Sequence, residues 1–309
     1  MNILITGGTG FIGSALCSRL VADQHNVVVL SRDPTLISRP LSGISSLSQL
    51  NENDVFDAVI NLAGEPIAEK TWRTRQKQRI WNSRIDTTEA VVDYLSSLRT
   101  KPEVLISGSA VGYYGVGKDS GPIVEGAQGD NSFSSMLCRD WESKARRAES
   151  FGVRTCLLRT GIVLGKRGGA LGKMLLPFKL GLGGKIGDGK HWMPWIHLND
   201  LIDIILFCIT HSRCTGPIAG SITEPIAGPI NATAPNAVTN QEFTCTLGKV
   251  LNRPTFFTMP AAAIKMLMGQ MGEELLLSGK QVYPEAISQA GYNFKYEHLK
   301  DALSDILEK

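Results

Sequence analysis

The segment TGGTGFIG, residues 6–13, has the glycine spacing of a phosphate-binding turn. Its glycines allow two readings, GxxGxxG or GxGxxG, and they are Gly7, Gly8, Gly10 and Gly13. Glycine is needed where the backbone turns sharply, approaches a pyrophosphate without an intervening Cβ, or lets a helix pack closely on a strand. The following helix would begin at Phe11 and Ile12 and present N–H groups to the phosphates. The segment therefore predicts dinucleotide binding.

The end of the second predicted strand indicates which dinucleotide is bound. The stretch VVLSRDP places Ser31 and Arg32 where a carboxylate would bind the ribose hydroxyl groups of NAD. A hydroxyl and a guanidinium suit a 2′-phosphate better, because they form charge-assisted hydrogen bonds with it. We therefore expect the cofactor to be NADP(H). In the alternative, Arg32 points into solvent and Asp33 binds the ribose.

The elements that would position these residues alternate between strands and helices. Apolar runs predicted as strands cover residues 2–6, 26–30, 56–63, 103–109, 153–160 and 228–234, and helical patterns cover residues 11–23, 72–99 and 134–150. This alternation is typical of an α/β fold with a doubly wound parallel sheet. We assign 1–165 to a dinucleotide-binding Rossmann domain, to which about 195–235 returns. A smaller, mostly helical C-terminal lobe would comprise 166–194 and 236–309.

The composition argues against several kinds of partner. The 309 residues carry a net charge of +3, with 43% hydrophobic and 20% charged residues. The richest basic stretch, RTRQKQR at residues 73–79, is interpreted as a solvated helix face, so no nucleic-acid partner is expected. No segment reaches the roughly 18 consecutive apolar residues of a membrane span, and the N-terminus has no signal-peptide pattern. We expect no membrane partner and a cytoplasmic location.

The cysteines and histidines give no sign of a metal site. Six cysteines are scattered without a CxxC pair and are expected to be buried, reduced thiols. None of the five histidines pairs with Cys, Asp or Glu at a zinc-like spacing, and His197 is expected to anchor a loop by hydrogen bonds. We therefore predict no metal. The repeat of PIAG at 217–220 and 225–228 is interpreted as a small duplication in a surface loop.

Together these motifs resemble the extended short-chain dehydrogenase/reductase superfamily, the group that includes UDP-sugar epimerases. The resemblance rests on the glycine motif, NLAG (61–64), ISGS (106–109), LRTGIVLG (158–165) and PWIHLNDL (194–201), and it covers most of the chain. The segments after 165 are more narrowly similar to an atypical, epimerase-like branch without a settled substrate.

The resemblance implies further cofactor contacts. Leu62, Ala63 and Gly64 would line the adenosine side of the groove, and Val163 would lie near the nicotinamide. Arg84, in WNSRIDTT, would contact the cofactor or an anionic substrate; the alternative is a cation on the helix surface.

The resemblance also implies an acid/base site, from which this chain departs. The superfamily uses a tyrosine whose pKa is lowered by a lysine four residues later, together with a serine that holds the substrate oxygen. Ser109 fits the serine position. In FSSMLCRDWESK, residues 133–144, Glu142 sets a register in which Ser134 and Cys138 stand at the tyrosine and lysine positions. No neighbouring register supplies both Tyr and Lys.

Three hypotheses remain for the reaction. Tyr113 or Tyr114 supplies the acid, with Cys138 as a weaker candidate. In the second hypothesis, an activated alkene or imine accepts hydride with little help from a protein acid. In the third, there is no turnover, and a monomer or homodimer acts as an NADP(H)-binding sensor or scaffold. A small-molecule substrate of unknown identity would lie in a cleft walled by residues 176–184 and 192–195; in the alternative, these residues form the core of the lobe.

Overall fold

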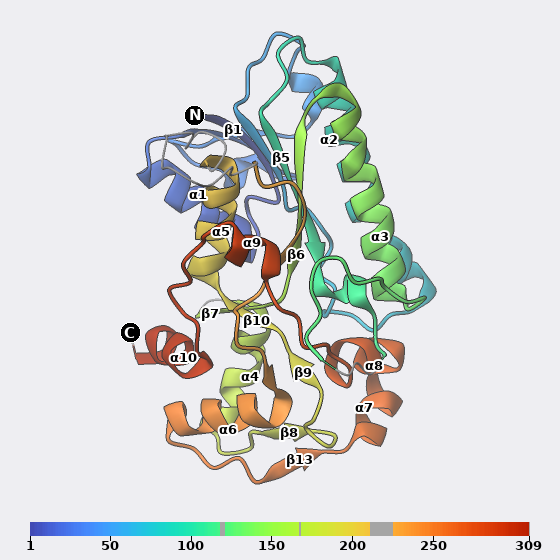
Figure 1. Ribbon diagram of the computed structural model, residues 1–309, viewed down its shortest axis with the longest axis vertical. Helices are drawn as coiled ribbons and strands as arrows, with labels where there is room; N and C mark the ends of the chain where they lie inside the picture. The colour runs from blue at the N-terminus through green and yellow to red at the C-terminus, as the bar shows by residue number, and fades with distance from the viewer. Residues whose placement is uncertain (118–120, 167, 211–224, 309) are drawn as a thin grey trace.

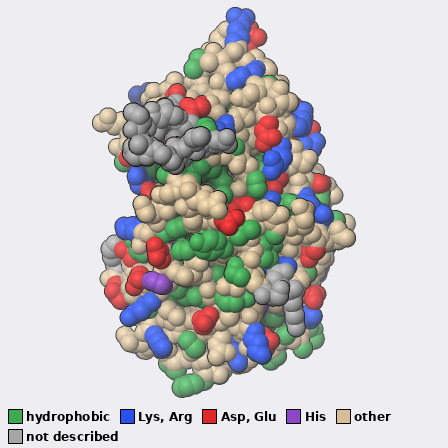
Figure 2. Space-filling view, viewed as in Figure 1, with side chains coloured by type: hydrophobic (Ala, Val, Ile, Leu, Met, Phe, Trp, Pro, Cys, Tyr) green, Lys and Arg blue, Asp and Glu red, His purple; other side chains and the backbone are tan. Residues whose placement is uncertain are grey.

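The computed structural model describes residues 1–117, 121–166, 168–210 and 225–308, and Figure 1 shows an elongated molecule with a sheet at one end. Charged side chains of both signs are spread over the face drawn in Figure 2. The first PIAG copy of the predicted loop duplication, at 217–220, lies outside the described residues.

Seven parallel strands form the central sheet. They are β1 (Asn2–Thr6), β2 (Asn26–Leu30), β3 (Ser42–Ile44), β4 (Ala58–Asn61), β5 (Val104–Ala110), β6 (Arg154–Thr160) and β11 (Gly228–Ala232). Their order across the sheet is β11-β6-β5-β4-β1-β2-β3, and every neighbouring pair is parallel. The predicted doubly wound sheet is therefore confirmed. The short edge strand β3 was not predicted, because Ser-Gly-Ile has no apolar run.

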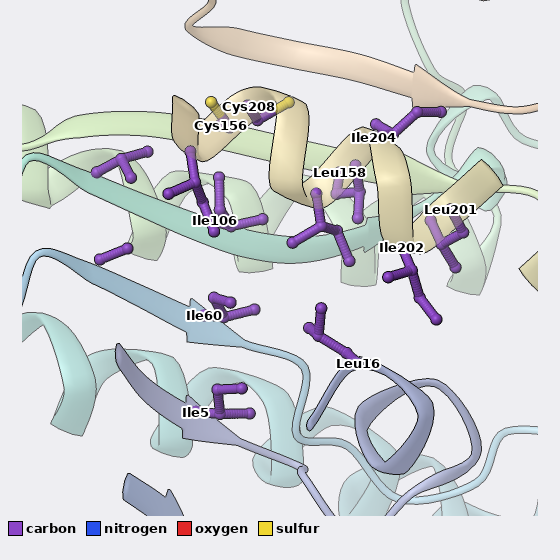
Figure 3. Close-up of a cluster of buried hydrophobic side chains, with 14 of the residues drawn as sticks. Ile5, Leu16, Ile60, Ile106, Cys156, Leu158, Leu201, Ile202, Ile204 and Cys208 are labelled. Atoms are coloured by element: carbon purple, nitrogen blue, oxygen red, sulfur yellow. The ribbon is translucent and has the colours of Figure 1, made fainter. Parts of the chain in front are cut away.

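Helices cover both faces of this sheet (Figure 1). One face is covered by α1 (Phe11–Ala22) and α5 (Leu198–Thr210), and the other by α2 (Thr74–Ser97) and α3 (Phe133–Arg146). Figure 3 shows the core between the sheet and the helices α1 and α5, in which Ile5, Ile60 and Ile106 face Leu16 of α1 and Leu201 of α5. Because the central strands β1, β4 and β5 are buried on both faces, their sequences are almost continuously apolar.

The smaller lobe lies beyond the carboxyl ends of the strands (Figure 1). Its helices are α4 (Gly169–Lys179), α6 (Asn240–Leu251), α7 (Ala261–Met268), α8 (Gln270–Leu276) and α10 (Leu299–Glu308), whereas α9 (Glu285–Gln289) packs against the sheet domain through Ile287. Three strand pairs join them: β7 (Ile162–Gly165) with β10 (Trp195–His197), β8 (Gly184–Ile186) with β13 (Phe257–Met259), and β9 (Trp192–Met193) with β12 (Val238–Thr239). Strand β11 returns the chain to the sheet beside β6. The domain boundaries themselves stay a prediction.

The aromatic segment 192–195 belongs to the core of the lobe. Trp195 is 0% exposed, Met193 8% and Phe178 4%, and all three pack in one cluster with α6 and α10. The indole N–H of Trp195 donates to the carbonyl of Asn236 (3.0 Å). At these positions, the proposed cleft wall is therefore wrong, because the large apolar side chains fill the interior of the lobe.

The cysteine and histidine predictions have mixed outcomes. Cys17, Cys138, Cys156 and Cys208 are buried and free, but Cys245 is exposed, so that part of the prediction is wrong. His197 anchors its loop as expected: its Nδ1 accepts the backbone N–H of Asn199 (3.0 Å) at the start of α5. None of the helices that the structure describes is long and apolar enough to cross a membrane.

Truncation of Trp195 separates the two assignments of segment 192–195. In Trp195→Ala we expect the free energy of unfolding to fall by about 3–5 kcal/mol, because a large cavity opens in the core. Denaturant unfolding measures this change, and Leu36→Ala, at a side chain 69% exposed, is the control with little effect. If Trp195→Ala were as stable as Leu36→Ala, Trp195 would belong to a cleft wall and not to the core.

Candidate functional site

The glycine turn lies where the carboxyl ends of β1 and β4 meet. Gly7 has φ +74°, and a Cβ there would lie 2.7 Å from the carbonyl carbon of Leu62. A Cβ at Gly13 would lie 2.1 Å from the carbonyl oxygen of Gly7. A Cβ at Gly10 would meet only the Gly7 oxygen, at 3.3 Å. Gly7 and Gly13 thus close the turn tightly against β4, whereas Gly10 leaves open space where a phosphate would approach.

The start of α1 offers backbone donors to that space. Gly10 is the N-cap residue, no side chain caps the helix, and its first turn contains no acidic residue. The N–H groups of Phe11, Ile12 and Gly13 therefore have no acceptor within the helix, which is the arrangement that favours an anion. The ring of Phe11 packs against the turn before α4, since a Cβ at Gly168 would lie 2.6 Å from it.

A chain of buried polar groups fixes the edge of the groove. The hydroxyl of Thr6 donates to Asn61 Oδ1 (2.6 Å) and accepts the N–H of Ala63 (3.1 Å). The amide of Asn61 and the indole of Trp141 both donate to the hydroxyl of Thr88, at 2.7 and 2.8 Å. These bonds tie β1, β4, α2 and α3 together below the predicted contacts Leu62 and Ala63. Sequence reasoning missed this chain.

Asp33 is engaged in local structure at the end of β2. Its carboxylate accepts hydrogen bonds from both the N–H (3.1 Å) and the hydroxyl of Thr35, and it thereby caps a short 3-10 turn. The Ser31 hydroxyl donates to the backbone carbonyl of Asp33 (3.0 Å) and accepts its N–H (3.2 Å). These bonds weaken the alternative in which Asp33 binds a ribose.

Arg32 lines an open hollow of about 520 Å³ together with two further arginines. They are Arg75 and Arg79, one turn apart on α2, and Glu65 lies on the same wall. Within the part of the chain that the structure describes, none of the three arginines forms an ion pair. Three cations around one carboxylate leave positive charge available for an anion. The interpretation of residues 73–79 as only a solvated face missed this arrangement.

Arg84 points toward the segment after β4, at Gly64 and Glu65, and away from the outer surface of α2. Its guanidinium packs against Gly64, where a Cβ would lie 3.0 Å from Cζ, and it lies 5.3 Å from the ring centroid of Trp141. It donates to the carbonyls of Glu65 and Ile80, each at 3.1 Å. Burial lowers the pKa of Arg84. The surface alternative is wrong; contact with a cofactor stays a prediction.

Ser109 lies above a buried ion pair. The carboxylate of Glu142 and the guanidinium of Arg159 make two hydrogen bonds, at 2.8 and 2.9 Å, with side chains 5% and 3% exposed. The Ser109 hydroxyl donates to the same carboxylate (2.7 Å). Burial alone would lower the pKa of Arg159, but Glu142 raises it above its usual value. Because the Ser109 proton is committed to Glu142, its oxygen retains only acceptor capacity in this state.

The ion pair extends into a network that crosses the sheet. Arg159 also donates to the Tyr114 hydroxyl (3.0 Å) and to the Glu125 carbonyl (2.9 Å). Tyr114 in turn donates to Asn231 Oδ1 (2.6 Å) on β11. An arginine inside a strand predicted to be buried on both faces is a signal that could have found this pair, because such a charge requires a partner.

Two of the candidate acids are buried in this network. Burial raises the pKa of Tyr114 to about 12, despite the opposing charge of Arg159. Burial, reinforced by the Glu142 carboxylate, raises the pKa of the Cys138 thiol to about 11. A group that holds its proton so firmly in a closed environment is poorly matched to proton transfer near neutral pH.

Tyr113 differs from its neighbour. It is half-buried, its ring centroid lies 3.4 Å from Cζ of Arg159, and its carbonyl accepts the Ser135 hydroxyl (2.7 Å). Its own hydroxyl makes no hydrogen bond to any residue that the structure describes. The 3-10 turn η3 (Val111–Tyr114) lies against the first turn of α3, since a Cβ at Gly112 would lie 3.1 Å from Cβ of Ser134.

Ser134 stands at the position of the superfamily's tyrosine and is hydrogen-bonded to a residue of the lobe. Ser134 donates through its N–H (2.9 Å) and hydroxyl (2.7 Å) to the carboxylate of Glu274 on α8. The same carboxylate accepts the N–H of Phe133 (3.1 Å) and the amide of Gln270 (2.7 Å). A carboxylate at a helix N-terminus is stabilised by the helix dipole as well as by these bonds. Val163 lies on β7, partly buried against the main core.

Comparison with known proteins assigns the chain to a family. Residues 3–218 match the model of the NAD dependent epimerase/dehydratase family. The chain belongs to this family. Residues 259–306 match a domain of unknown function, DUF1731. The family model therefore covers the glycine turn and every strand of the sheet except β11, while the second model covers α7 to most of α10.

Full-length relatives share both parts. The chain is 37% identical to the chloroplastic epimerase family protein SDR39U1 homolog of Arabidopsis thaliana, covering 100% of this chain and 87% of the relative. It is 34% identical to the epimerase family protein SDR39U1 of Homo sapiens, covering 99% and 100%.

Solved structures show the same fold. A crystal structure of the human SDR39U1 protein with NADPH has a TM-score of 0.88 at 33% identity, covering 100% of this chain and 99% of that one. UDP-glucose 4-epimerase of Thermotoga maritima has a TM-score of 0.74 at 17% identity, covering 100% and 98%, and this likeness concerns the fold alone.

Removal of Arg159 tests the ion pair of this family member. We expect Arg159→Met to lower the free energy of unfolding by about 3–5 kcal/mol, because the Glu142 carboxylate stays buried without its cation. The double variant Glu142→Leu/Arg159→Met should recover part of that loss. The control is Arg146→Met, which removes an exposed ion pair with Glu149. Urea unfolding that gives Arg159→Met and the control equal stability would contradict the assignment.

Proposed function

We propose that this family member binds NADP(H) and is a reductase or epimerase acting on a small molecule. The observation that carries the proposal is the hollow lined by Arg32, Arg75 and Arg79 at the end of β2. It lies where the 2′-position of a dinucleotide bound at the glycine turn would arrive. The human relative, whose crystal structure was solved with NADPH, supports the choice of cofactor.

The residues for the rest of the cofactor are proposed as follows. The open face of Gly10 and the free N–H groups of α1 suit the pyrophosphate. Leu62, Ala63 and Gly64 form the adenosine edge, and Arg84, packed on Gly64, faces the nicotinamide half near Cys138. A guanidinium there would take the position of the cation that the missing lysine supplies in relatives.

A second hollow, of about 610 Å³, is proposed to admit the substrate. Trp81 and Phe133 give it aromatic surface, and Arg73 and Lys77 give it positive charge. Lys77 lies 5.1 Å from the centroid of Phe133, one residue before the vacant tyrosine position. A hollow of this composition suits a planar or apolar molecule that carries an acidic group.

The chemistry assigned to this chain is one proton transfer and the orientation of the substrate. NADPH, when bound, supplies the hydride. Tyr113 is proposed as the acid, because its hydroxyl makes no hydrogen bond to a described residue and Arg159 fixes its ring. Ser109 is proposed to accept a hydrogen bond from the substrate, since its own proton is given to Glu142.

A non-catalytic NADP(H) sensor is the second candidate. Glu274 supports it, because this carboxylate of the lobe binds the first turn of α3, at the position where the resemblance to the short-chain dehydrogenase/reductase superfamily implies a catalytic tyrosine. Cofactor binding beside that turn would then change the position of the lobe and be detected by a partner.

The arginine hollow is tested by comparing two cofactors. We expect NADPH to bind at least tenfold more tightly than NADH, and Arg32→Gln and Arg79→Gln each to weaken NADPH by about tenfold, because a charge-assisted hydrogen bond to phosphate is lost. NADH affinity should change less than about twofold, since NADH has no 2′-phosphate. Fluorescence titration measures both, with Arg73→Gln, which lines the other hollow, as control. Tighter binding of NADH would contradict the proposal.

Turnover is tested with deuterated NADPH and a metabolite extract. Label should enter at least one metabolite, and Tyr113→Phe should slow this transfer about a hundredfold or more while NADPH affinity stays unchanged. The control is Tyr94→Phe on α2, whose ring packs against Phe56 before the start of β4. Cofactor binding without label transfer in any extract would favour the sensor. Full activity of Tyr113→Phe would remove Tyr113 as the acid.

A further inference from the structure

The end of the lobe carries large apolar side chains in contact with solvent. Strands β8 and β13 form this end in Figure 1, far from β1 and the N-terminus. We call it the tip and define it as residues 179–190 and 249–268. Its exposed apolar residues are Leu180 (65%), Leu182 (57%), Phe256 (89%), Phe257 (55%), Met259 (54%), Met266 (83%) and Leu267 (71%). Such a concentration is unusual for a surface without a partner.

Printed contacts join the two segments of the tip into one surface. Arg253 donates through Nε to the carbonyl of Lys179 (2.8 Å). The N–H of Gly187 donates to the carbonyl of Met259 (2.9 Å), and β8 pairs with β13 in parallel register. The apolar side chains at the end of α4 and on β13 are therefore neighbours, and α7 follows β13 directly.

The tip is strongly basic, although the chain as a whole is nearly balanced. The two segments contain six Lys or Arg residues and one acidic residue, Asp188, whereas the whole chain has 32 and 29. Only Lys265 has an ion pair among the described residues, with Glu273 (2.8 Å). The cations are Lys179, Lys185, Lys190, Lys249, Arg253 and Lys265. Figure 2 shows green and blue side chains together at the lower end.

We propose that the tip docks on an anionic lipid surface. A second copy of the chain is a poor occupant, because a two-fold contact would bring the two sets of cations together. Phe256 stands out from the surface with 89% exposure, so its ring can insert among lipid headgroups. A bilayer accepts protruding apolar side chains in its interface while its anionic headgroups attract the surrounding lysines.

The proposal departs from our expectation of no membrane partner. That expectation considered only segments that span a bilayer, and the tip would lie on the surface without entering the hydrocarbon core. The proposal is independent of the cofactor and of the reaction, since every residue of the tip lies outside the glycine turn and the arginine hollow.

Flotation with lipid vesicles tests the tip. The full chain should float with vesicles of phosphatidylcholine containing 30% phosphatidylglycerol, and binding to pure phosphatidylcholine should be at least tenfold weaker. Phe256→Ser/Phe257→Ser should reduce binding to the anionic vesicles at least tenfold, because two interfacial anchors are lost. Lys179→Gln/Lys185→Gln should reduce it several-fold and lower its dependence on salt by about a third, because two of the six cations are lost.

Leu36→Ser provides the matched control, since Leu36 is 69% exposed but lies on the sheet domain. It should bind vesicles like the unmodified chain, and the unfolding midpoint of each variant should be unchanged because the substituted side chains are exposed. Equal binding to both kinds of vesicle, or none to either, would overturn the proposal. A concentration-dependent dimer that Phe256→Ser/Phe257→Ser dissociates would replace the lipid with a second copy.

Discussion

The ion pair between Glu142 and Arg159 is the interaction on which the site depends. Two opposite charges almost without solvent are stable only when every remaining donor and acceptor finds a partner. Ser109, Tyr114 and the carbonyl of Glu125 meet that demand here. Their positions on β5, η3 and the segment before α3 are therefore coupled. The pair fixes α3 against the sheet with a precision that apolar contacts alone would not give.

This requirement also determines which groups are left for chemistry. A hydroxyl whose proton stabilises a buried carboxylate cannot also donate that proton to a substrate. Tyr114 is likewise occupied on both sides of its oxygen, by Arg159 and by Asn231. The ring of Tyr113, one residue earlier, packs on the same guanidinium, but its hydroxyl makes no hydrogen bond to a described residue. Under the proposed function, Tyr114 therefore has a structural role and Tyr113 is the phenol left for the chemistry.

Periodicity in the sequence was sufficient for the sheet but not for the site. The limits of β1 and β2 agree with the predicted runs, because burial on both faces requires continuous apolar residues. The aromatic segment 192–195 was misplaced, since a cleft wall and a core have the same composition. The arginine hollow was missed because Arg32 and Arg79 are brought together only by the order of the strands. The partner of Ser134 is 140 residues away, on α8.

The hydrogen bonds between Ser134 and Glu274 link the lobe to the first turn of α3. The cluster of Trp72, Phe133 and Met271 packs α8 onto α2 and α3 and holds this carboxylate in place. The first turn of α3 therefore receives its cap from the lobe as well as from Ser132, its own N-cap residue. A ligand that displaces α8 must leave two backbone donors without their charged acceptor, which opposes the motion. Binding of a ligand in the hollow beside Phe133 and movement of the lobe would therefore be thermodynamically linked.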